Sequence, residues 1–260
     1  IEVVTEATPF YGESGGQVGD TGRIYADDGG AVFEMSVEDT IKDPTGLIIH
    51  KGKLVSGSLN QNQGVVLQVD NQKRAATALN HTATHILHYA LRQILGEHVK
   101  QAGSSVGPDR FRFDFTHFSK VEQTELNAIE TLVNDKIRDN VAVQKDEMDA
   151  EEALKSGATA LFEEKYGDRV RVISLADFSR ELCGGTHTNQ TGDLGLFKII
   201  SESSVASGVR RIEAVTGRTA VDVVQQTAGL LNESALMLRD KTQALPQRIQ
   251  NHLRQQRESD

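Results

Sequence analysis

Cysteine is almost absent from this chain of 260 residues, which contains eight histidines but only one cysteine, Cys183. An intramolecular disulfide is therefore excluded, and the lone cysteine points to metal binding or catalysis. There is no apolar run of about eighteen residues, and residues 1–4 form neither a charged leader nor a hydrophobic signal, so membrane spanning and secretion are unsupported. We expect a cytoplasmic protein. Because the chain opens on Ile1 and not on methionine, we also expect a piece of a longer protein.

Basic residues are in deficit, and the formal net charge is −9. This charge argues against a general nucleic-acid binder, since lysine and arginine contacts to phosphate supply most non-specific affinity. The acidic excess is concentrated in residues 1–70. A nucleic-acid partner is therefore expected only through local contacts made by the middle and the tail of the chain.

Residues 1–70 consist of short β-branched runs separated by clusters of Gly, Asp and Asn, a pattern typical of a small antiparallel barrel or sandwich. We expect a small β-barrel domain here. The runs are residues 18–20, 22–25, 31–37, 46–50 and 65–69, with a turn at Asp28-Gly29-Gly30. The glycine-rich segment 13–17 fits neither dinucleotide nor Walker spacing, and it is interpreted as a tight turn.

Residues 71–217 alternate helical and strand patterns without βαβ fingerprints, which predicts an α+β domain with a mixed, largely antiparallel sheet and packed helices. A long amphipathic helix is expected from about Asn71 to Gly96. The other predicted helices span residues 121–138 and 150–156, and the predicted strands span 99–106, 111–115, 141–147, 170–175, 196–201 and 210–215.

Residues 218–260 form a third part, a helical tail with a heptad seam. The seam is made of Val224, Leu231, Leu238 and Leu245, and Pro246 is expected to start a second helix. This seam is expected to pair within the chain, with a second copy, or with a segment outside it.

The chemistry is expected at two pairs of residues. His81 and His85 lie four apart on the predicted helix and so share one face, with a separation that suits a single ion. About a hundred residues later, Cys183 and His187 flank a turn with two glycines that let both side chains fold inward. Three imidazoles and a thiolate form a ligand set that suits Zn²⁺ better than Mg²⁺ or Ca²⁺.

Familiar zinc classes do not fit this ligand set. The segment between His81 and His85 lacks the glutamate that a metalloprotease uses as base, and a second cysteine for a zinc finger is missing. His88 is interpreted as a packing or solvent residue. The remaining histidines have no partner spacing and are interpreted as ordinary: His50, His98, His117 and His252.

Five separated motifs, in this order, resemble the editing domain of bacterial alanyl-tRNA synthetases. They are Pro9-Phe10-Tyr11 with Gly15-Gly16-Gln17, Asn80 to His85, Arg112 to Phe115, Cys183 to Thr188, and Gly208 to Gly217. The resemblance covers residues 1 to about 217, and the tail is similar to the start of that family's helical linker. Threonyl-tRNA synthetase editing domains are less similar, and free-standing alanyl deacylases share the motifs.

The resemblance implies a function and a site. The family's metal positions correspond to His81, His85, Cys183 and His187, and Gln101 matches a glutamine associated with the editing pocket. The implied reaction is hydrolysis of the ester in tRNA(Ala) mischarged with serine or glycine. Signatures for adenylate formation are not recognised, so we expect hydrolysis without aminoacylation.

A second, hydrolytic site has a physical rationale. Serine and glycine differ from alanine by one hydroxyl or one methyl, and one site discriminates such differences by only about 1–3 kcal/mol. Our hypothesis is that the metal orients a water or the substrate amino group, while Thr82, Thr84 and Gln101 sense the side-chain hydroxyl. Three firm ligands with an exchangeable fourth position, or four ligands with an ordering role, both stay open.

The contacts to tRNA are expected at Arg210 and Arg211, which follow Ser207-Gly208. The alternative for both arginines is intramolecular pairing with Glu202 and Glu213. Three other functions are weighed beside editing by a synthetase fragment: a stand-alone deacylase, a zinc-stabilised tRNA-binding module without turnover, and an assembly piece that acts through its heptad seam.

Overall fold

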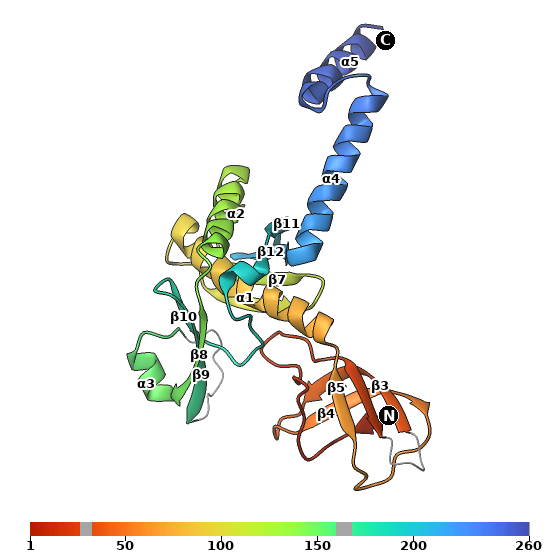
Figure 1. Cartoon of the computed structure of the whole chain (residues 1–260). Helices are drawn as coiled ribbons and strands as arrows, with labels where there is room; N and C mark the ends of the chain where they lie inside the picture. The colour runs from red at the N-terminus through yellow and green to blue at the C-terminus, as the bar shows by residue number, and fades with distance from the viewer. Residues whose placement is uncertain (27–32, 160–167, 260) are drawn as a thin grey trace. The chain divides into compact units, whose positions relative to one another are not determined.

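The computed structural model describes residues 1–26, 33–159 and 168–259. These residues form two compact units, 1–217 and 218–260, and Figure 1 labels most of their helices and strands. The turn predicted at Asp28-Gly29-Gly30 and the start of the strand predicted at residues 31–37 lie outside the described residues. The domain boundary predicted near residue 70 falls within the first unit and stays a prediction.

The N-terminal part of the first unit is a five-stranded antiparallel sheet in the order β1-β4-β3-β2-β5. Alternation sets its inner face, as in β3, where Phe33, Met35 and Val37 are buried. The all-β prediction is confirmed, and closure of this sheet into a barrel stays a prediction. Residues 18–20, predicted as a strand, lie outside the strands. The strands are β1 (Glu2–Val3), β2 (Gly22–Ala26), β3 (Phe33–Lys42), β4 (Ile48–Ser56) and β5 (Val66–Val69).

The long helix predicted after this sheet is confirmed as α1 (Asn71–Leu95). Asp70 caps its start, because the carboxylate accepts hydrogen bonds from the backbone N–H groups of Gln72 and Lys73, each at 3.1 Å. Gly96 ends the helix with a φ of 115°, a conformation that favours glycine. The two histidines of this helix are thus held on a long, well-capped element.

The remaining strands of the first unit form two antiparallel sheets, which corrects the prediction of a single mixed sheet. One has the order β11-β12-β7-β6 and the other the order β10-β9-β8. Strand β10 escaped prediction because its four residues carry no hydrophobic alternation. The strands are β6 (Gln101–Val106), β7 (Phe111–Thr116), β8 (Val143–Asp149), β9 (Arg169–Leu175), β10 (Ser179–Leu182), β11 (Phe197–Ala206) and β12 (Val209–Thr216), and the helices are α2 (Gln123–Arg138), α3 (Ala150–Lys155) and the 3-10 helix η1 (Thr191–Leu194).

The main core lies between α1, α2 and the four-stranded sheet. Phe111, Phe113 and Phe115 alternate along β7, so all three rings enter the core, where they join Leu87 and Leu91 of α1. Burial of three aromatic rings is a large stabilising contribution. This core fixes α1 against the sheet and so fixes the position of its histidines.

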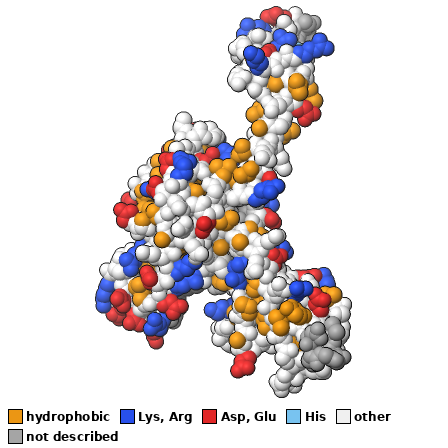
Figure 2. Space-filling model, viewed as in Figure 1, with side chains coloured by type: hydrophobic (Ala, Val, Ile, Leu, Met, Phe, Trp, Pro, Cys, Tyr) orange, Lys and Arg blue, Asp and Glu red, His pale blue; other side chains and the backbone are white. Residues whose placement is uncertain are grey.

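The second unit contains α4 (Gly217–Met237), the 3-10 helix η2 (Thr242–Ala244) and α5 (Leu245–Ser259). Pro246 lies in the first turn of α5, as predicted. Leu238 lies outside the helices, so the predicted seam is interrupted there. Figure 2 shows hydrophobic side chains along α4, where Val224 is 43% and Leu231 is 50% exposed. Pairing of this seam stays a prediction. No helix among the described residues is long and apolar enough to cross a membrane.

Candidate metal centre

The first half of the centre comes from α1, where His81 and His85 lie on the same face one turn apart. Their rings are stacked, with centroids 5.6 Å apart and an interplanar angle of 12°. His85 is 1% and His81 7% exposed. Two buried imidazoles in this arrangement present their ring nitrogens to the same small volume.

The second half comes from the turn after β10, which carries Cys183 and His187. Arg171 of β9 holds this turn, because its guanidinium donates to the carbonyl oxygens of Cys183, at 3.0 Å, and of Gly185. Lys145 of β8 donates to the carbonyl oxygen of His187 at 2.9 Å. The three-stranded sheet therefore fixes the backbone that positions the thiol and the third imidazole.

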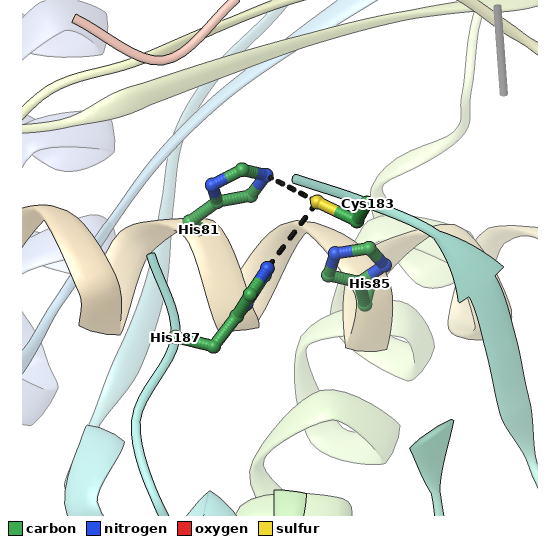
Figure 3. A group of neighbouring side chains, drawn as sticks. All are labelled: His81, His85, Cys183 and His187. Carbon is green, nitrogen blue, oxygen red and sulfur yellow. Dashed lines mark hydrogen bonds between the residues drawn. The ribbon is translucent and has the colours of Figure 1, made fainter. Parts of the chain in front are cut away.

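The two halves meet in one cluster, as Figure 3 shows. The Sγ atom of Cys183 lies 3.3 Å from Nε2 of His81 and 3.3 Å from Nε2 of His187. With His85 included, the four ligand atoms all lie within 4.8 Å of one another. Bonds of about 2.0–2.3 Å in a tetrahedral arrangement place ligand atoms about 3.5 Å apart. The four side chains thus form a group that could hold a metal ion.

The outer ring nitrogens of two histidines are anchored by side-chain oxygens. Nδ1 of His81 donates to Oε1 of Gln17 at 2.6 Å, and Nδ1 of His187 donates to Oγ1 of Thr82 at 3.2 Å. The hydroxyl of Thr82 itself donates to the carbonyl oxygen of Ala78, so it is free to accept from His187. With the proton on Nδ1, each ring would direct its Nε2 lone pair inward, which is the tautomer that a metal ligand needs.

The third ring, His85, is anchored by a carboxylate. Its Nδ1 contacts Oε2 of Glu181, and Oε1 of the same carboxylate accepts from Nδ1 of His88 at 2.7 Å. Nε2 of His85 is buried and has no hydrogen-bond partner among the described residues. An orphaned inward nitrogen on a carboxylate-anchored imidazole is the arrangement found in carboxylate–histidine–metal triads.

Gly185 is required by the close approach of the turn to α1. A Cβ atom at this position would lie 1.9 Å from Cε1 and 2.2 Å from Nδ1 of His81. Gly184 differs, because a Cβ atom there would have no neighbour within 4 Å. Both glycines were expected to let the turn fold inward, and the structure restricts this need to Gly185.

The charges of the cluster favour a cation. Burial raises the pKa of the Cys183 thiol, but His81 and then His187 outweigh burial and hold this pKa well below its usual range. Burial, assisted by His81, lowers the pKa of His187 to about 3. The site thus offers a thiolate beside a neutral imidazole, which is the protonation state of metal ligands.

His85 and Glu181 form a coupled pair. Burial opposes the charge of both groups. Glu181 and then Cys183 nevertheless raise the pKa of His85 to about 10. His85 and His88 in turn lower the pKa of Glu181 to about 2. Without a metal, His85 is therefore an imidazolium at neutral pH. A metal ion must displace this proton in order to bind Nε2.

Metal uptake should consequently release the His85 proton. Below the raised pKa of His85, each bound metal ion releases one proton. The apparent association constant for the metal should therefore rise about tenfold per pH unit between about pH 7 and pH 9. Competition with a chelator of known pH dependence measures this slope. Glu181→Gln, which removes the charge that stabilises the imidazolium, should flatten it, and an equal slope in both proteins would contradict the assignment.

The predicted substrate-sensing residues lie at different places relative to the cluster. Thr82 is fully buried, and its hydroxyl contacts Nδ1 of His187. This contact is typical of a residue that positions a metal ligand. Thr84 is 6% exposed, and its hydroxyl donates to the carbonyl oxygen of His81 at 2.7 Å. Gln101 starts β6 and donates to Oγ of Ser104 at 3.3 Å. Within the described parts of the chain, Gln101 makes no hydrogen bond with the four ligands, and the three sensing roles stay predictions.

The predicted tRNA contacts, Arg210 and Arg211, are both paired with carboxylates. Arg210 pairs with Glu202, as expected if this arginine is paired within the chain. Arg211 donates two hydrogen bonds, of 2.7 and 2.8 Å, to Asp114 and not to the expected partner Glu213. The side chain of Arg210 is 14% exposed. Much of their positive charge is already neutralised, and the role of both arginines in binding tRNA stays a prediction.

Sequence reasoning missed several partners of the cluster. Gln17 is the main one: its segment was interpreted as a tight turn, although Gly15-Gly16-Gln17 was among the family motifs. Glu181 was missed because it lies in the unpredicted strand β10. His98 and His117, interpreted as ordinary residues without partner spacing, contact each other through ring nitrogens 2.9 Å apart. Because these two histidines are far apart in the chain, no spacing pattern in the sequence indicates that they pair.

Replacement of Gln17 by leucine should weaken metal binding about 10- to 100-fold, the range seen when an outer-shell partner is lost. The substitution removes the acceptor of the His81 proton and also the acceptor of the backbone N–H of Thr186, at 2.8 Å. Metal titration measures the effect. Gln123→Leu, on the exposed face of α2, is the matched control and should bind metal as the unaltered protein does. Equal affinities for all three proteins would refute a positioning role for Gln17.

Two models of known protein families match parts of this chain. A family model described as "Threonyl and Alanyl tRNA synthetase second additional domain" matches residues 170–213, and a model described as "tRNA synthetases class II (A)" matches residues 1–73. The first covers β9, β10 and the Cys183 turn, and the second covers the N-terminal sheet and the Gln17 segment.

Curated relatives match nearly the whole chain. The alanine-tRNA ligase of Desulfosudis oleivorans is 60% identical over 257 residues, which are 99% of this chain and 29% of the relative. Those of Methylococcus capsulatus and Thermotoga maritima are 53% and 49% identical over 95% and 96% of the chain, and 28% of each relative. The chain therefore spans less than a third of the length of these relatives. The resemblance inferred from the five motifs is confirmed, and the chain belongs to the alanine-tRNA ligase family.

Proposed function

We propose that this chain hydrolyses the ester bond of tRNA(Ala) mischarged with serine or glycine, and that Zn²⁺ is the ion of its metal centre. The observation that carries the proposal is the convergence of four ligand atoms within 4.8 Å from two segments a hundred residues apart. The family supports a tRNA substrate, because the relatives are named alanine-tRNA ligases.

The donor set supports zinc. One thiolate and three imidazoles are soft to borderline ligands, which Zn²⁺ prefers and Mg²⁺ or Ca²⁺ does not. When bound, such an ion acts as a Lewis acid that polarises a carbonyl oxygen and orders the groups around it. The pairs described above, His81 with Gln17, His187 with Thr82 and His85 with Glu181, hold the ligands for this ion before it binds.

Residues of the chain itself supply a polar wall beside the ligands. Gln17 is 1% exposed, and its Nε2 group is buried without a partner among the described residues, so it is available to donate to an oxygen of the substrate. Burial, with a contribution from the Cys183 thiolate, raises the pKa of Tyr11 to about 12. Tyr11 therefore stays a neutral phenol near the cluster, and the segment between β1 and β2 contributes both residues.

The test is to incubate the chain with tRNA(Ala) carrying serine, glycine or alanine and to follow loss of the ester. We expect release of serine and glycine, and retention of alanine. Removal of zinc by a chelator should stop the release, and zinc should restore it. Release of all three amino acids at equal rates would contradict proofreading.

A tRNA-binding module without turnover is the second candidate. The observation that favours it is the number of protein ligands, because four side chains complete a tetrahedral set and structural zinc sites are closed in this way. In the same assay this module would bind the charged tRNA stoichiometrically and release none of the three amino acids.

A further inference from the structure

Two histidines outside the metal centre lie side by side in the first unit. His98 follows the end of α1, and His117 follows the end of β7. Nε2 of His98 lies 2.9 Å from Nδ1 of His117, and the two rings are stacked with centroids 5.2 Å apart. His98 is exposed and His117 is half-buried, so solvent reaches the pair. Two accessible imidazoles with ring nitrogens in contact are a candidate site for a cation.

The backbone beside each histidine is fixed by hydrogen bonds. The hydroxyl of Thr116 donates to the carbonyl oxygen of His98 at 2.8 Å and accepts from the backbone N–H of Lys100 at 2.9 Å. The backbone N–H of His117 donates to the carbonyl oxygen of Gly208, in the turn between β11 and β12, at 2.9 Å. The two imidazoles are thus held next to each other by their main chains, which is the preorganisation that a site with two ligands requires.

The other ring nitrogen of His117 has a side-chain partner. Nε2 of His117 lies 3.1 Å from Oγ of Ser119. When this hydroxyl accepts from Nε2–H, the lone pair of the His117 ring is on Nδ1 and faces His98. An oxygen that binds the outer N–H group of an imidazole in this way is the usual companion of a histidine that ligates a metal.

The separation of the two facing nitrogens suits a chelated ion. As a hydrogen bond, the contact of 2.9 Å has one hydrogen between Nε2 of His98 and Nδ1 of His117. Two metal–nitrogen bonds of about 2.0–2.1 Å that meet at a right angle place their nitrogens about 2.8–3.0 Å apart. With the His98 proton on Nδ1, an ion could therefore take the place of the shared hydrogen with little change in the distance between the rings.

The ligand type and the angle indicate which ions fit. Imidazole nitrogens suit Zn²⁺, Cu²⁺ and Ni²⁺, whereas Mg²⁺ and Ca²⁺ prefer oxygen ligands. Right angles between nitrogens are found at Cu²⁺ and Ni²⁺, while a tetrahedral ion such as Zn²⁺ needs nitrogens about 3.3 Å apart. Among the described residues, no third histidine, cysteine or carboxylate converges on the pair. Water would complete the coordination, so we expect weaker binding here than at the four-residue cluster.

The charges around the pair are compatible with a cation. Burial and then His98 lower the pKa of His117, so this imidazole is neutral at pH 7, the form that binds metal. Arg210 acts on this pKa in the same direction, but it is paired with Glu202. Glu125 acts in the opposite direction. The nearest arginine is thus neutralised by one carboxylate, and a second carboxylate attracts positive charge to the pair.

We propose that His98 and His117 form a second transition-metal site, which takes Cu²⁺ or Ni²⁺ and joins the connection between α1 and β6 to the loop after β7. The site is separate from the first centre, because α1 continues for ten residues after His85 and His98 lies beyond its end. At 1.5 Å per residue, those ten residues alone span about 15 Å. The inference does not depend on the proposed function.

The test is titration of Ni²⁺ into the zinc-loaded chain, prepared without a histidine tag, so that the four-residue cluster is already occupied. We expect one Ni²⁺ to bind per chain. His98→Ala and His117→Ala should each weaken this binding more than about 100-fold, since loss of an outer partner alone weakens a site about 10- to 100-fold. Ser119→Ala, which removes such a partner, should weaken it about tenfold. His252→Ala removes an exposed imidazole from α5 and should change nothing.

Zinc content should be equal in all these proteins, which a misfolded variant would not show. His117→Gln keeps a side chain that can hydrogen-bond to His98 but removes the ligand, so it should lose Ni²⁺ even where His117→Ala does not fold. Ni²⁺ binding that persists in both histidine variants, loss in only one of them, an equal loss in His252→Ala, or no binding to the unaltered protein would each overturn the assignment. The deacylation assay reports on the proposed function alone, so the two can fail independently.

Discussion

Gly185→Ala should abolish metal binding at the four-residue cluster and, with it, ester hydrolysis. The added Cβ atom would lie 1.9 Å from Cε1 of His81, far inside van der Waals contact. Either the His81 ring turns away from the thiolate or the turn moves and carries Cys183 with it. In both cases the ligand atoms separate, and we expect a loss of more than about 100-fold in metal affinity, beyond the effect of an outer-shell change.

Gly184→Ala is the matched control for this prediction. It adds the same methyl group to the neighbouring residue, where nothing lies within 4 Å. Metal titration and the deacylation assay should find Gly184→Ala equal to the unaltered protein. If both alanine variants bound metal normally, the close packing of the turn on α1 would not be a requirement of the site.

Cys183→Ala should produce a loss of similar size, because the thiolate is the single anionic ligand and lies 3.3 Å from two imidazole nitrogens. At a zinc concentration about 100 times Kd, binding stabilises the folded protein by about 2.7 kcal/mol. A 100-fold weaker site would retain about 0.4 kcal/mol of this stabilisation at the same concentration. Denaturant unfolding with and without zinc measures the difference, and serine release should fall with it.

The control for Cys183→Ala is His252→Ala. It removes an imidazole from the exposed surface of α5 and leaves the cluster intact. Its zinc-dependent increase in the free energy of unfolding should equal that of the unaltered protein. An increase of the same size in Cys183→Ala would show that zinc binds elsewhere.

The ligand residues could be predicted from the sequence because local rules place them. The spacing of His81 and His85 on a strongly periodic helix fixes their common face, and Cys183 and His187 are close in the chain. Their meeting across a hundred residues could not come from spacing alone. It was inferred from the combined chemistry of three imidazoles and the single thiol and then from the resemblance to a family, and the structure supplies it through the packing of the turn on α1.

The residues behind the ligands could not be predicted in this way. Gln17 reaches His81 because its segment docks on β6, where the backbone N–H of Val18 donates to the carbonyl oxygen of Val106 at 3.0 Å. Glu181 lies in a strand of four residues with no hydrophobic alternation. The same lack of pattern hid the division of the strands into two sheets, since strand pairing depends on long-range contacts that a single sequence does not display.

The docking of the Gln17 segment has a consequence for protein engineering. The carbonyl oxygen of Gly16 accepts from the backbone N–H of Val106 at 2.8 Å, so the segment is held on β6 from both sides of Gln17. The candidate metal centre is therefore not a portable module that begins at α1. A transplanted fragment without the first sheet and the Gln17 segment would keep all four ligand residues. It would lose the oxygen of Gln17 that accepts from Nδ1 of His81 and so favours the tautomer needed for metal binding.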